Sequence, residues 1–430
     1  MISKNRIDRR VFVKSLGVLV GFAVLSVLAG FPVLEESLAQ TKEPIKIGFI
    51  IPLTGPYGTE AREQEMGAVV AVEEFNAKGG VLGRKVELLV RDDKLKPEEA
   101  AKRAKELLEK DKVHLMAGSL GSHTQLAMNE QCKFAKTVLM TISQSNEIAQ
   151  APDASPYTFT EGQCPHMATQ GLGKWAIENL GKKWFYLIAD YSYGWQLLDG
   201  YRLVGQKYGG VDAGLIKHPL GAVDYTKYFP TILAAEPQVL VIGNYGKDQL
   251  NSLKQIHEFG LKKKMKIVCS VPSFTARQGA GDEVFEDVYG ELTFYWELAE
   301  SLPSAKAFVA NYKKRWGPPP SDFSGYAYGG IKDLLSAVER AGELDAKKII
   351  LKLEGHVYDN DKGKQWIRAW DHRAMQDLYI VKSKSARERT GEWDFFKIVH
   401  TVKADDSLER KAEEKGLKAD VPLSRYLEKP

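Results

Sequence analysis

Short apolar segments alternate with helix-like segments along residues 45–270. The apolar segments are mostly continuous rather than alternating, as expected for strands that are covered on both faces of a sheet. They occupy 45–51, 86–90, 113–117, 138–143, 184–189, 239–242 and 267–270. Between the first two segments, the apolar spacing over Ala68–Phe75 follows the helical period, and Gly79 and Gly80 end the helix. The alternation predicts βαβ units that form doubly wound parallel α/β sheets.

The last third of the chain predicts three more helices and a polar end. The helices are expected at about 304–316, 321–341 and 346–353. Strand-like segments follow at Tyr379–Val381 and Phe395–Val399. Beyond Val402 the chain is strongly charged with few aromatic residues, which favours a surface helix or partial disorder over residues 403–430.

The first 39 residues show the parts of an export signal. A basic start precedes an apolar run over Leu16–Leu34, and Ser37–Ala39 has the small outer residues that suit a signal peptidase. The segment Asp8–Lys14 contains Arg9 and Arg10 and resembles the twin-arginine export signal. We therefore expect a signal peptide that is cleaved near Ala39, with the twin-arginine export machinery as a partner. The alternative is an uncleaved anchor helix, because the apolar run is about long enough to span a bilayer.

Composition narrows the class of protein further. A length of 430 residues with 44% apolar content is enough for two ordinary domains. The net charge of +4 gives no basic surface for nucleic acid. Three cysteines in an exported chain of this length form at most one disulfide, for which Cys132 and Cys164 are the candidates, and buried free thiols are the favoured interpretation.

The loops that follow the predicted strands are the segments expected to carry function. A doubly wound sheet binds its ligands beyond the carboxyl ends of its strands. These loops are 52–60, 118–125, 144–147, 190–194, 243–248 and 271–274. They are rich in Gly, Ser, Thr, Asn and Tyr and poor in charged residues. Such side chains offer neutral hydrogen bonds and aromatic faces, which favours binding over acid–base catalysis.

Five short segments of the chain, taken together, resemble the corresponding segments of a known protein family. They are Ile47–Gly58 (IGFIIPLTGPYG), Asn76–Gly83 (NAKGGVLG), Ala189–Gly194 (ADYSYG), Gly243–Tyr245 (GNY) and Glu258–Leu261 (EFGL). In this order and spacing they resemble the type I periplasmic solute-binding proteins of ABC transporters, of the branched-chain amino acid and amide-binding family with its leucine-binding-protein domain. The similarity covers about residues 45–400.

The resemblance implies two lobes joined by three crossovers, in the Venus flytrap arrangement of type I periplasmic binding proteins. Lobe one is expected over 44–160 plus 293–367, and lobe two over 161–292 plus 368–402. The resemblance also implies a small-molecule ligand between the lobes and an ABC importer permease in the inner membrane as partner. We expect a monomer in the periplasm, with no cofactor and no nucleic-acid partner.

The candidate ligand-binding residues follow the strands or are expected to face the cleft. They are Tyr57, Ser122, His123, Thr124, Ser143, Gln144, Ser145, Tyr193, Asn244, Tyr245, Ser270 and Trp296. A helix that begins near Ser122 aims free N–H groups at an anionic ligand group, although Ser122 or Thr124 could simply cap that helix. The resemblance implies that Ser143–Ser145 meet a ligand carboxylate and that Tyr193 and Tyr245 close over the ligand.

One departure from the family affects the choice of ligand. Its amino acid binders hold the ligand ammonium with a carboxylate beside the strand that ends here at Val268–Pro272, and that segment contains no acid. A buried ammonium without a partner costs several kcal/mol. An α-amino acid is therefore disfavoured unless Glu161 or Glu297 substitutes, and amides, small carboxylates and aromatic acids stay open.

The sequence gives less support to an enzyme or to a sensor lobe. The eight histidines show no H-x-x-x-H or H-E-x-x-H spacing, so no metal site is predicted, and no G-x-S-x-G segment occurs. Cys164 and His166 are too close in sequence to suit a catalytic pair. A secreted cofactor enzyme is kept as an alternative because twin-arginine export often serves such enzymes. A sensor lobe is the other alternative, should the first apolar run stay uncut.

Overall fold

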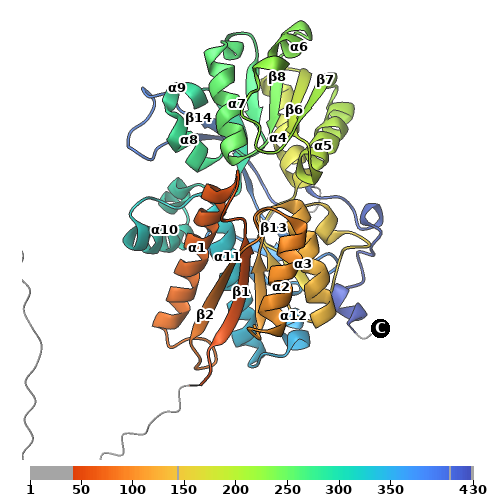
Figure 1. The fold of residues 1–430 in the computed structure, drawn as a ribbon, viewed down its shortest axis with the longest axis vertical. Coiled ribbons are helices and arrows are strands. Elements are labelled where there is room, and N and C mark those ends of the chain that lie inside the picture. Colours follow the sequence, from red (N-terminus) through yellow and green to blue (C-terminus); the bar gives the residue numbers. More distant parts are fainter. Residues whose placement is uncertain (1–41, 143–144, 406–407, 428–430) are drawn as a thin grey trace, which may run out of the picture. The chain divides into compact units, whose positions relative to one another are not determined.

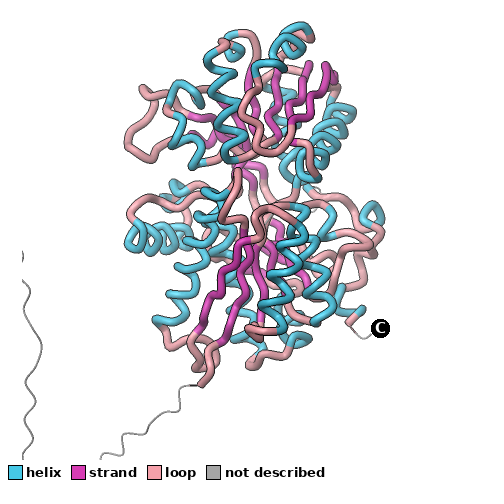
Figure 2. Tube along the Cα trace, in the orientation of Figure 1, coloured by secondary structure: helices cyan, strands magenta, loops and turns pink. Residues whose placement is uncertain are grey.

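Two parallel sheets organise the chain (Figures 1 and 2). The computed structural model describes residues 42–142, 145–405 and 408–427. All seven predicted apolar segments form strands, and the three helices predicted for the last third begin and end within one residue of their predicted bounds. The expected doubly wound α/β fold is confirmed.

Lobe one is built on a five-stranded sheet of order β2-β1-β3-β4-β5, in which every pair is parallel. Its strands are β1 (Ile45–Ile51), β2 (Val86–Asp92), β3 (Leu115–Gly118), β4 (Leu139–Thr141) and β5 (Thr158–Thr160). Its helices are α1 (Gly58–Ala77), α2 (Pro97–Glu109), α3 (Ser122–Ala135), α10 (Pro303–Trp316), α11 (Asp322–Ala341) and α12 (Ala346–Leu353). Helices α1 and α11 pack on each other, and α2 packs on α3 (Figure 1).

Lobe two is built on a seven-stranded sheet of order β15-β14-β10-β9-β8-β6-β7. Its parallel strands are β6 (Lys183–Ala189), β7 (Val211–His218), β8 (Val239–Gly243), β9 (Lys266–Cys269) and β10 (Val288–Leu292). Two antiparallel strands extend one edge, β14 (Leu378–Ser383) and β15 (Phe396–Val402). Its helices are α4 (Pro165–Asn179), α5 (Ser192–Tyr208), α6 (Phe229–Ala234), α7 (Gly246–Glu258), α8 (Phe274–Ala280) and α9 (Asp282–Phe285).

Three connections join the lobes. They run from β5 to α4, from β10 to the 3₁₀ helix η4 (Trp296–Glu300), and from a small antiparallel sheet to β14. The small sheet consists of β11 (Val357–Tyr358), β12 (Gln365–Ile367) and β13 (Ala374–Met375). The connections lie against one another, because the Thr160 N–H donates to the His372 carbonyl at 3.0 Å and Gln163 Nε2 donates to Glu291 Oε1.

The core of lobe one follows from the alternation of side chains along a strand. Ile45, Ile47 and Phe49 of β1 are fully buried in one apolar cluster, whereas Ile50 points to the other face and packs with residues of α2 and α3. Close packing of α1 on α11 requires a glycine, because a Cβ on Gly67 would lie 2.1 Å from the Ser324 carbonyl oxygen. This contact fixes α11 beside the first helix.

Three strands of the two large sheets lie outside the predicted strand segments: β5, β7 and β10. Strand β7 is a sheet edge that is mostly exposed or half-buried, so it lacks a continuous apolar run. Strand β10 contains Gly290 and Glu291 among its five residues. A buried strand that contains an acid gives a weak apolar signal, although it pairs with β9 and β14 in the middle of the sheet.

The charged tail differs from its prediction. Its described part, 408–427, contains the 3₁₀ helices η6 (Glu413–Lys415) and η7 (Leu423–Tyr426), and its backbone is tied to lobe one by the Ala151 N–H, which donates to the Lys415 carbonyl at 2.9 Å. Glu409 and Lys415 are buried. The expected surface helix or disorder is wrong here, because the tail charges pair with Asp371 and Arg373 near the third connection.

Three further expectations concern the cysteines, the N-terminal segment and membrane-spanning helices. Cys132, Cys164 and Cys269 are buried free thiols, so Cys132 and Cys164 do not pair. The expected signal peptide of residues 1–39 lies outside the described residues. No helix among the residues that the structure describes is long and apolar enough to cross a membrane.

Candidate functional site

Three tyrosines occupy helix N-cap positions at the carboxyl edges of the sheets. Tyr57 precedes α1 in lobe one, and Tyr191 and Tyr245 precede α5 and α7 in lobe two. None of them makes a side-chain capping hydrogen bond. Ser, Thr, Asp or Asn at an N-cap stabilises a helix by about 1 kcal/mol, which tyrosine does not provide. The choice of tyrosine at these N-cap positions is therefore explained better by the contacts that the rings make with the other lobe.

These tyrosines and two neighbours form one aromatic cluster from both lobes. The ring centroids of Tyr193 and Tyr245 are 4.8 Å apart, and their hydroxyl groups are hydrogen bonded. Tyr57 lies edge-on to Tyr245 with a centroid distance of 6.1 Å. Phe323, at the start of α11, lies 5.9 Å from Tyr245. We call the set Tyr57, Tyr191, Tyr193, Tyr245 and Phe323 the interlobe aromatic cluster.

The phenols of this cluster are neutral. Burial raises the pKa of Tyr57, Tyr193 and Tyr245 well above the ordinary value, and it also raises that of Tyr191. Each hydroxyl therefore keeps its proton at physiological pH and is able both to donate and to accept hydrogen bonds. The cluster offers flat apolar faces and neutral polar groups to a small molecule.

Polar contacts hold the two lobes together beside the cluster. Glu60 of α1 accepts hydrogen bonds on Oε1 from Ser273 Oγ at 2.8 Å and from Thr275 Oγ1 at 2.9 Å. The Lys247 N–H donates to the Pro56 carbonyl at 3.2 Å. On the other side, the Asn146 N–H donates to Gln196 Oε1 at 2.6 Å. The structure therefore presents the lobes in contact, in a closed arrangement.

The predicted residues on α3 lie at the same edge of lobe one. Ser122 is buried at the first position of α3. The His123 ring lies 5.5 Å from that of Tyr191, with Nε2 at 3.0 Å from the Leu95 carbonyl oxygen. Thr124 Oγ1 donates to the Gly121 carbonyl at 3.0 Å and also pairs with Ser119 Oγ at 2.5 Å. Gly121 is the N-cap of α3 and the helix has no side-chain capping hydrogen bond, so Thr124 makes local contacts without capping the helix, and His123 reaches lobe two.

Three other predicted residues are engaged within the protein. Ser145 Oγ accepts from the Glu147 N–H at 3.1 Å. Asn244 Nδ2 lies 3.0 Å from His218 Nε2, and the Asn244 carbonyl accepts from Gln249 Nε2 at 3.0 Å. Ser270 Oγ lies 3.1 Å from the Tyr201 hydroxyl. These contacts fix the loops after β4, β8 and β9.

Trp296 is placed apart from the aromatic cluster. Its Nε1 donates to the Trp393 carbonyl at 3.0 Å, and its ring lies beside Lys313 of α10. The structure thus brings Tyr57, Tyr193 and Tyr245 together but gives Trp296 other neighbours. Ser143 and Gln144 lie outside the described residues.

The two acids that the sequence suggested for an ammonium site are engaged elsewhere. Glu161 accepts on Oε1 from Lys362 Nζ at 2.7 Å and from Gln365 Nε2 at 2.9 Å. Glu297 lies 3.9 Å from Lys384 Nζ. Both carboxylates thus have partners within the protein.

A different acid stands beside Ser270. The N–H of Glu291 donates to the Ser270 carbonyl at 3.3 Å, so β10 brings a buried carboxylate next to the segment that lacks one in sequence. The sequence around Ser270 does not predict this acid, because Glu291 lies on the neighbouring strand β10 and only the sheet places it beside Ser270. Glu60, Tyr191 and Phe323 were also missed. The signal available for Tyr191 was an aromatic residue where a helix cap was expected.

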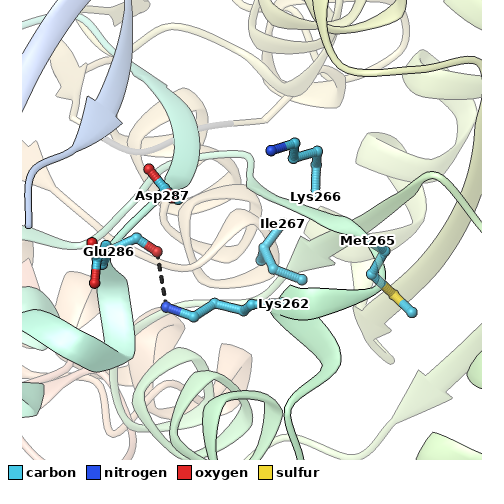
Figure 3. A pocket seen from close by; sticks show the side chains of 6 residues that line it. All are labelled: Lys262, Met265, Lys266, Ile267, Glu286 and Asp287. Carbon is cyan, nitrogen blue, oxygen red and sulfur yellow. Dashed lines mark hydrogen bonds between the residues drawn. The ribbon is translucent and has the colours of Figure 1, made fainter.

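A pocket at the opposite edge of lobe two has a simpler explanation (Figure 3). It encloses about 120 Å³ and is lined in part by Lys262, Lys266 and Ile267. Lys266 begins β9, so the pocket lies at the amino ends of the parallel strands, away from Ser270. Lys262 Nζ donates to the carbonyls of Glu283 at 2.6 Å and Glu286 at 2.8 Å. Its ammonium group therefore stabilises the end of a short helix.

Two features of the described residues concern metal binding and the Cys164 thiol. They contain no group of three or more His, Cys, Asp or Glu side chains placed to hold a metal ion. Burial raises the pKa of the Cys164 thiol to about 11, and its Sγ donates to Glu409 Oε2 at 3.0 Å. A buried protonated thiol is a poor nucleophile.

Two facing parallel α/β lobes, with aromatic and hydroxyl side chains between their carboxyl edges, define a two-lobed solute-binding protein. Residues 44–388 match the family model described as periplasmic binding protein. The chain belongs to this family, whose members of type I serve ABC transporters as exported proteins of the periplasm.

Individual relatives agree with this assignment. A Leu/Ile/Val-binding protein homolog 7 of Brucella abortus is 28% identical over 335 residues, which cover 74% of this chain and 82% of the relative. A periplasmic binding protein of Burkholderia mallei has a structure with a TM-score of 0.80 and 26% identity, over 86% of this chain and 97% of that one. A solute-binding protein of Rhodopseudomonas palustris, solved with 3,4-dihydroxybenzoic acid, has a TM-score of 0.76 and 23% identity, over 86% and 99%. These relatives are solute-binding proteins rather than enzymes.

Proposed function

We propose that this protein captures one small ligand between its two lobes and delivers it to the permease of an ABC importer. The observation that carries the proposal is the interlobe aromatic cluster, in which Tyr57 of lobe one meets Tyr245 of lobe two at the carboxyl edges of both sheets. A ligand that contacts both lobes favours the closed state through its differential contacts with that state.

The ligand contacts proposed for each lobe follow from this placement. Lobe one offers Tyr57, Ser122 and His123, with the positive end of the α3 dipole for an anionic group of the ligand. Lobe two offers Tyr193 and Tyr245. Thr124, Ser145, Asn244 and Ser270 support the loops around these groups or complete the polar contacts, and Trp296 is the weakest candidate. Ser143 and Gln144, which lie outside the described residues, stay proposed ligand contacts.

The experiment that tests this proposal identifies the ligand and measures closure. The protein is purified from its native host and denatured, and the released small molecule is identified by mass spectrometry. Added back to empty protein, the compound is expected to raise the melting temperature by mass action and to lower the radius of gyration in small-angle scattering. Binding without compaction would show that the ligand site lies elsewhere.

Replacing Tyr193 or Tyr245 with Ala is expected to weaken binding of that compound by about 1–2 kcal/mol, because each loses aromatic contact and a hydrogen bond in the closed state. Isothermal titration calorimetry measures the change. Tyr208→Ala is the matched control, since Tyr208 lies at the other end of α5 from Tyr193. Equal affinities in all three variants would contradict the assignment of the site.

The export route gives a separate prediction. We propose that residues 1–39 are a twin-arginine signal peptide that is cleaved near Ala39. Replacing both Arg9 and Arg10 with Lys is then expected to leave the precursor in the cytoplasm, because the paired arginines carry the match to this signal. Cell fractionation and intact mass measure the outcome. Normal export of the double variant would indicate the general secretion route, and a membrane-bound product that keeps Met1–Ala39 would indicate an anchor.

A further inference from the structure

The loops at the amino ends of the parallel strands of lobe two hold an excess of lysine. Segments 180–183, 235–238 and 258–266 lead into β6, β8 and β9, and they contain six lysines and two glutamates. Their formal net charge is therefore as large as the +4 of the whole chain. The nearly balanced charge of the chain thus conceals a positive excess at this end of lobe two, which α6 marks in Figure 1.

Hydrogen bonds to Gln238 bring the three segments together. Gln238 Oε1 accepts from the N–H groups of Lys182 at 2.7 Å and Lys183 at 3.1 Å. The Gln238 carbonyl accepts from the Lys266 N–H at 2.9 Å. Strands β6 and β9 both flank β8, so Lys183 and Lys266 at their starts lie roughly 10 Å apart, which is two strand spacings. The lysines therefore share one surface.

Five of the six lysines on this surface have unpaired ammonium groups. Lys262 is the exception, because its Nζ donates to backbone carbonyls, including that of Glu286 (Figure 3). The side chains of the other five make no ion pair or hydrogen bond within the described part of the chain, and all of them except Lys183 are exposed. We call the five residues the basic end of lobe two: Lys182, Lys183, Lys263, Lys264 and Lys266.

The acids in the neighbourhood do not neutralise the basic end. Asp287, at the entry to β10, pairs with Lys382 at 2.8 Å. Glu236 and Glu258 are exposed, and neither makes an ion pair with a residue that the structure describes. The basic end therefore keeps a positive excess that only solvent and salt screen.

Two apolar side chains are exposed beside these lysines. Phe259 follows α7 and is 60% exposed, with its ring 5.3 Å from that of Phe229. Val211 is 54% exposed, and its N–H donates to the Lys182 carbonyl at 2.8 Å. Lysines around exposed apolar groups are typical of surfaces that bind an anionic membrane, where ammonium groups meet the headgroups and apolar groups enter the acyl boundary.

We propose that the basic end of lobe two binds the surface of a membrane that contains anionic phospholipids. The chain belongs to a family that serves ABC transporters, so it works beside a membrane. Lysine supplies the point charges that attract such headgroups, and segments 180–183, 235–238 and 258–266 contain no arginine for the bidentate base contacts of nucleic-acid binders.

This contact is separate from the ligand site. The basic end lies at the amino ends of the strands, whereas the site proposed between the lobes lies at their carboxyl edges. Membrane binding is therefore expected with and without ligand. Its failure would leave the proposed capture of a ligand between the lobes untouched.

Cosedimentation of the mature protein with lipid vesicles tests the proposal. Vesicles of phosphatidylcholine alone are compared with vesicles that also contain phosphatidylglycerol. At low salt the protein is expected to bind the anionic vesicles at least about tenfold more tightly than the neutral ones. High salt is expected to weaken this binding, because it shortens the range of the attraction. Equal binding to both kinds of vesicle, or no binding at low salt, would overturn the proposal.

A double variant assigns the binding to this surface. Lys263→Gln combined with Lys264→Gln is expected to weaken binding to anionic vesicles by about 10- to 30-fold, since each lysine near such a surface strengthens binding about fivefold. Lys306→Gln combined with Lys314→Gln is the matched control, because both residues are exposed lysines of α10 in lobe one. Equal weakening by the two pairs would assign the effect to total charge and overturn the proposal.

The apolar contribution has its own pair of variants. Phe259→Ser is expected to weaken binding about threefold or more, because the ring no longer enters the acyl boundary. Phe134→Ser is the control, since Phe134 is 88% exposed on α3 of lobe one. Equal binding by the two variants would contradict the contact of Phe259 with the membrane.

An acidic protein segment is the other partner that lysines attract. Tighter binding to a short poly-glutamate peptide than to anionic vesicles, lost in the double lysine variant, would assign the basic end to such a segment and overturn the lipid proposal. The double variant is expected to keep the wild-type melting temperature, because substitutions of exposed residues change stability little. Loss of vesicle binding at an unchanged melting temperature would support the proposal.

Discussion

Replacing Lys415 with Met is expected to lower the free energy of unfolding by about 3–5 kcal/mol, the usual cost of removing one partner from a buried ion pair. Lys415 Nζ lies 2.7 Å from Asp371 Oδ2 and 3.0 Å from Glu409 Oε2, and all three side chains are fully buried. The substitution leaves two negative charges in the interior with one cation fewer. Urea unfolding monitored by circular dichroism measures the change.

The matched control lies in the same tail. Lys403 pairs with Asp377 at 2.7 Å, but its side chain is 80% exposed. Exposed ion pairs contribute about 0–1 kcal/mol, so Lys403→Met is expected to have little effect. Equal destabilisation by the two substitutions would show that the tail does not depend on its buried ion pairs.

The pH dependence gives an independent measurement. Burial alone would raise the pKa of Glu409, but the charges of Lys415 and Arg373 hold it well below its ordinary value. A group whose pKa is depressed by folding adds stability above its unfolded pKa, about 4.3 for Glu, and loses it as the pH falls through the folded value. The wild type and Lys415→Met are therefore expected to show the whole difference in free energy of unfolding at pH 7. This difference is expected to shrink below about pH 4.

Replacing Gly246 with Ala is expected to weaken ligand binding by about 2–3 kcal/mol, roughly 30- to 150-fold, by obstructing lobe closure. Gly246 is the first residue of α7 and has a φ of 53°. A Cβ there would lie 2.7 Å from the Pro56 carbonyl oxygen and 2.9 Å from Glu60 Oε2. Both atoms belong to lobe one, so the clash arises only when the lobes meet.

The control for this substitution is Gly209→Ala. Gly209 has a φ of 78°, and a Cβ there would meet nothing within 4 Å. Both variants carry the same kind of backbone strain, about 1 kcal/mol, but only Gly246→Ala meets the other lobe. Calorimetry with the released native ligand and small-angle scattering compare them. Full compaction of Gly246→Ala with unchanged affinity would show that the closed arrangement described here is not the bound state.

Loss of closure and loss of local contact are distinguishable by these variants. Tyr193→Ala removes a proposed ligand contact but leaves room for the lobes to meet, so compaction is expected at saturating ligand. Gly246→Ala leaves the tyrosines intact and is expected to reduce compaction even at saturation. The two results together separate ligand contact from domain movement.

Much of the fold could be predicted from the sequence because strands buried on both faces leave continuous apolar runs. The segment 45–51 coincides with β1, and the helix predicted at 346–353 coincides with α12. Three of the tyrosines that meet in the interlobe aromatic cluster, Tyr57, Tyr193 and Tyr245, were found in loops after the strands, since parallel strands bring such loops to one edge.

What the sequence by itself determined is therefore the alternation of strands and helices and the family resemblance, and it also indicated the edge at which the binding site is proposed. Only the tertiary structure decided which charges are paired. Glu161 and Glu291 are both buried acids, yet Glu161 meets Lys362 from 201 residues away, whereas Glu291 accepts from Gln163 Nε2 and has no ion pair within the part of the chain that the structure describes. The physical reason is that apolar burial leaves a local periodic signal, whereas a charge depends on whichever distant segment folding places next to it.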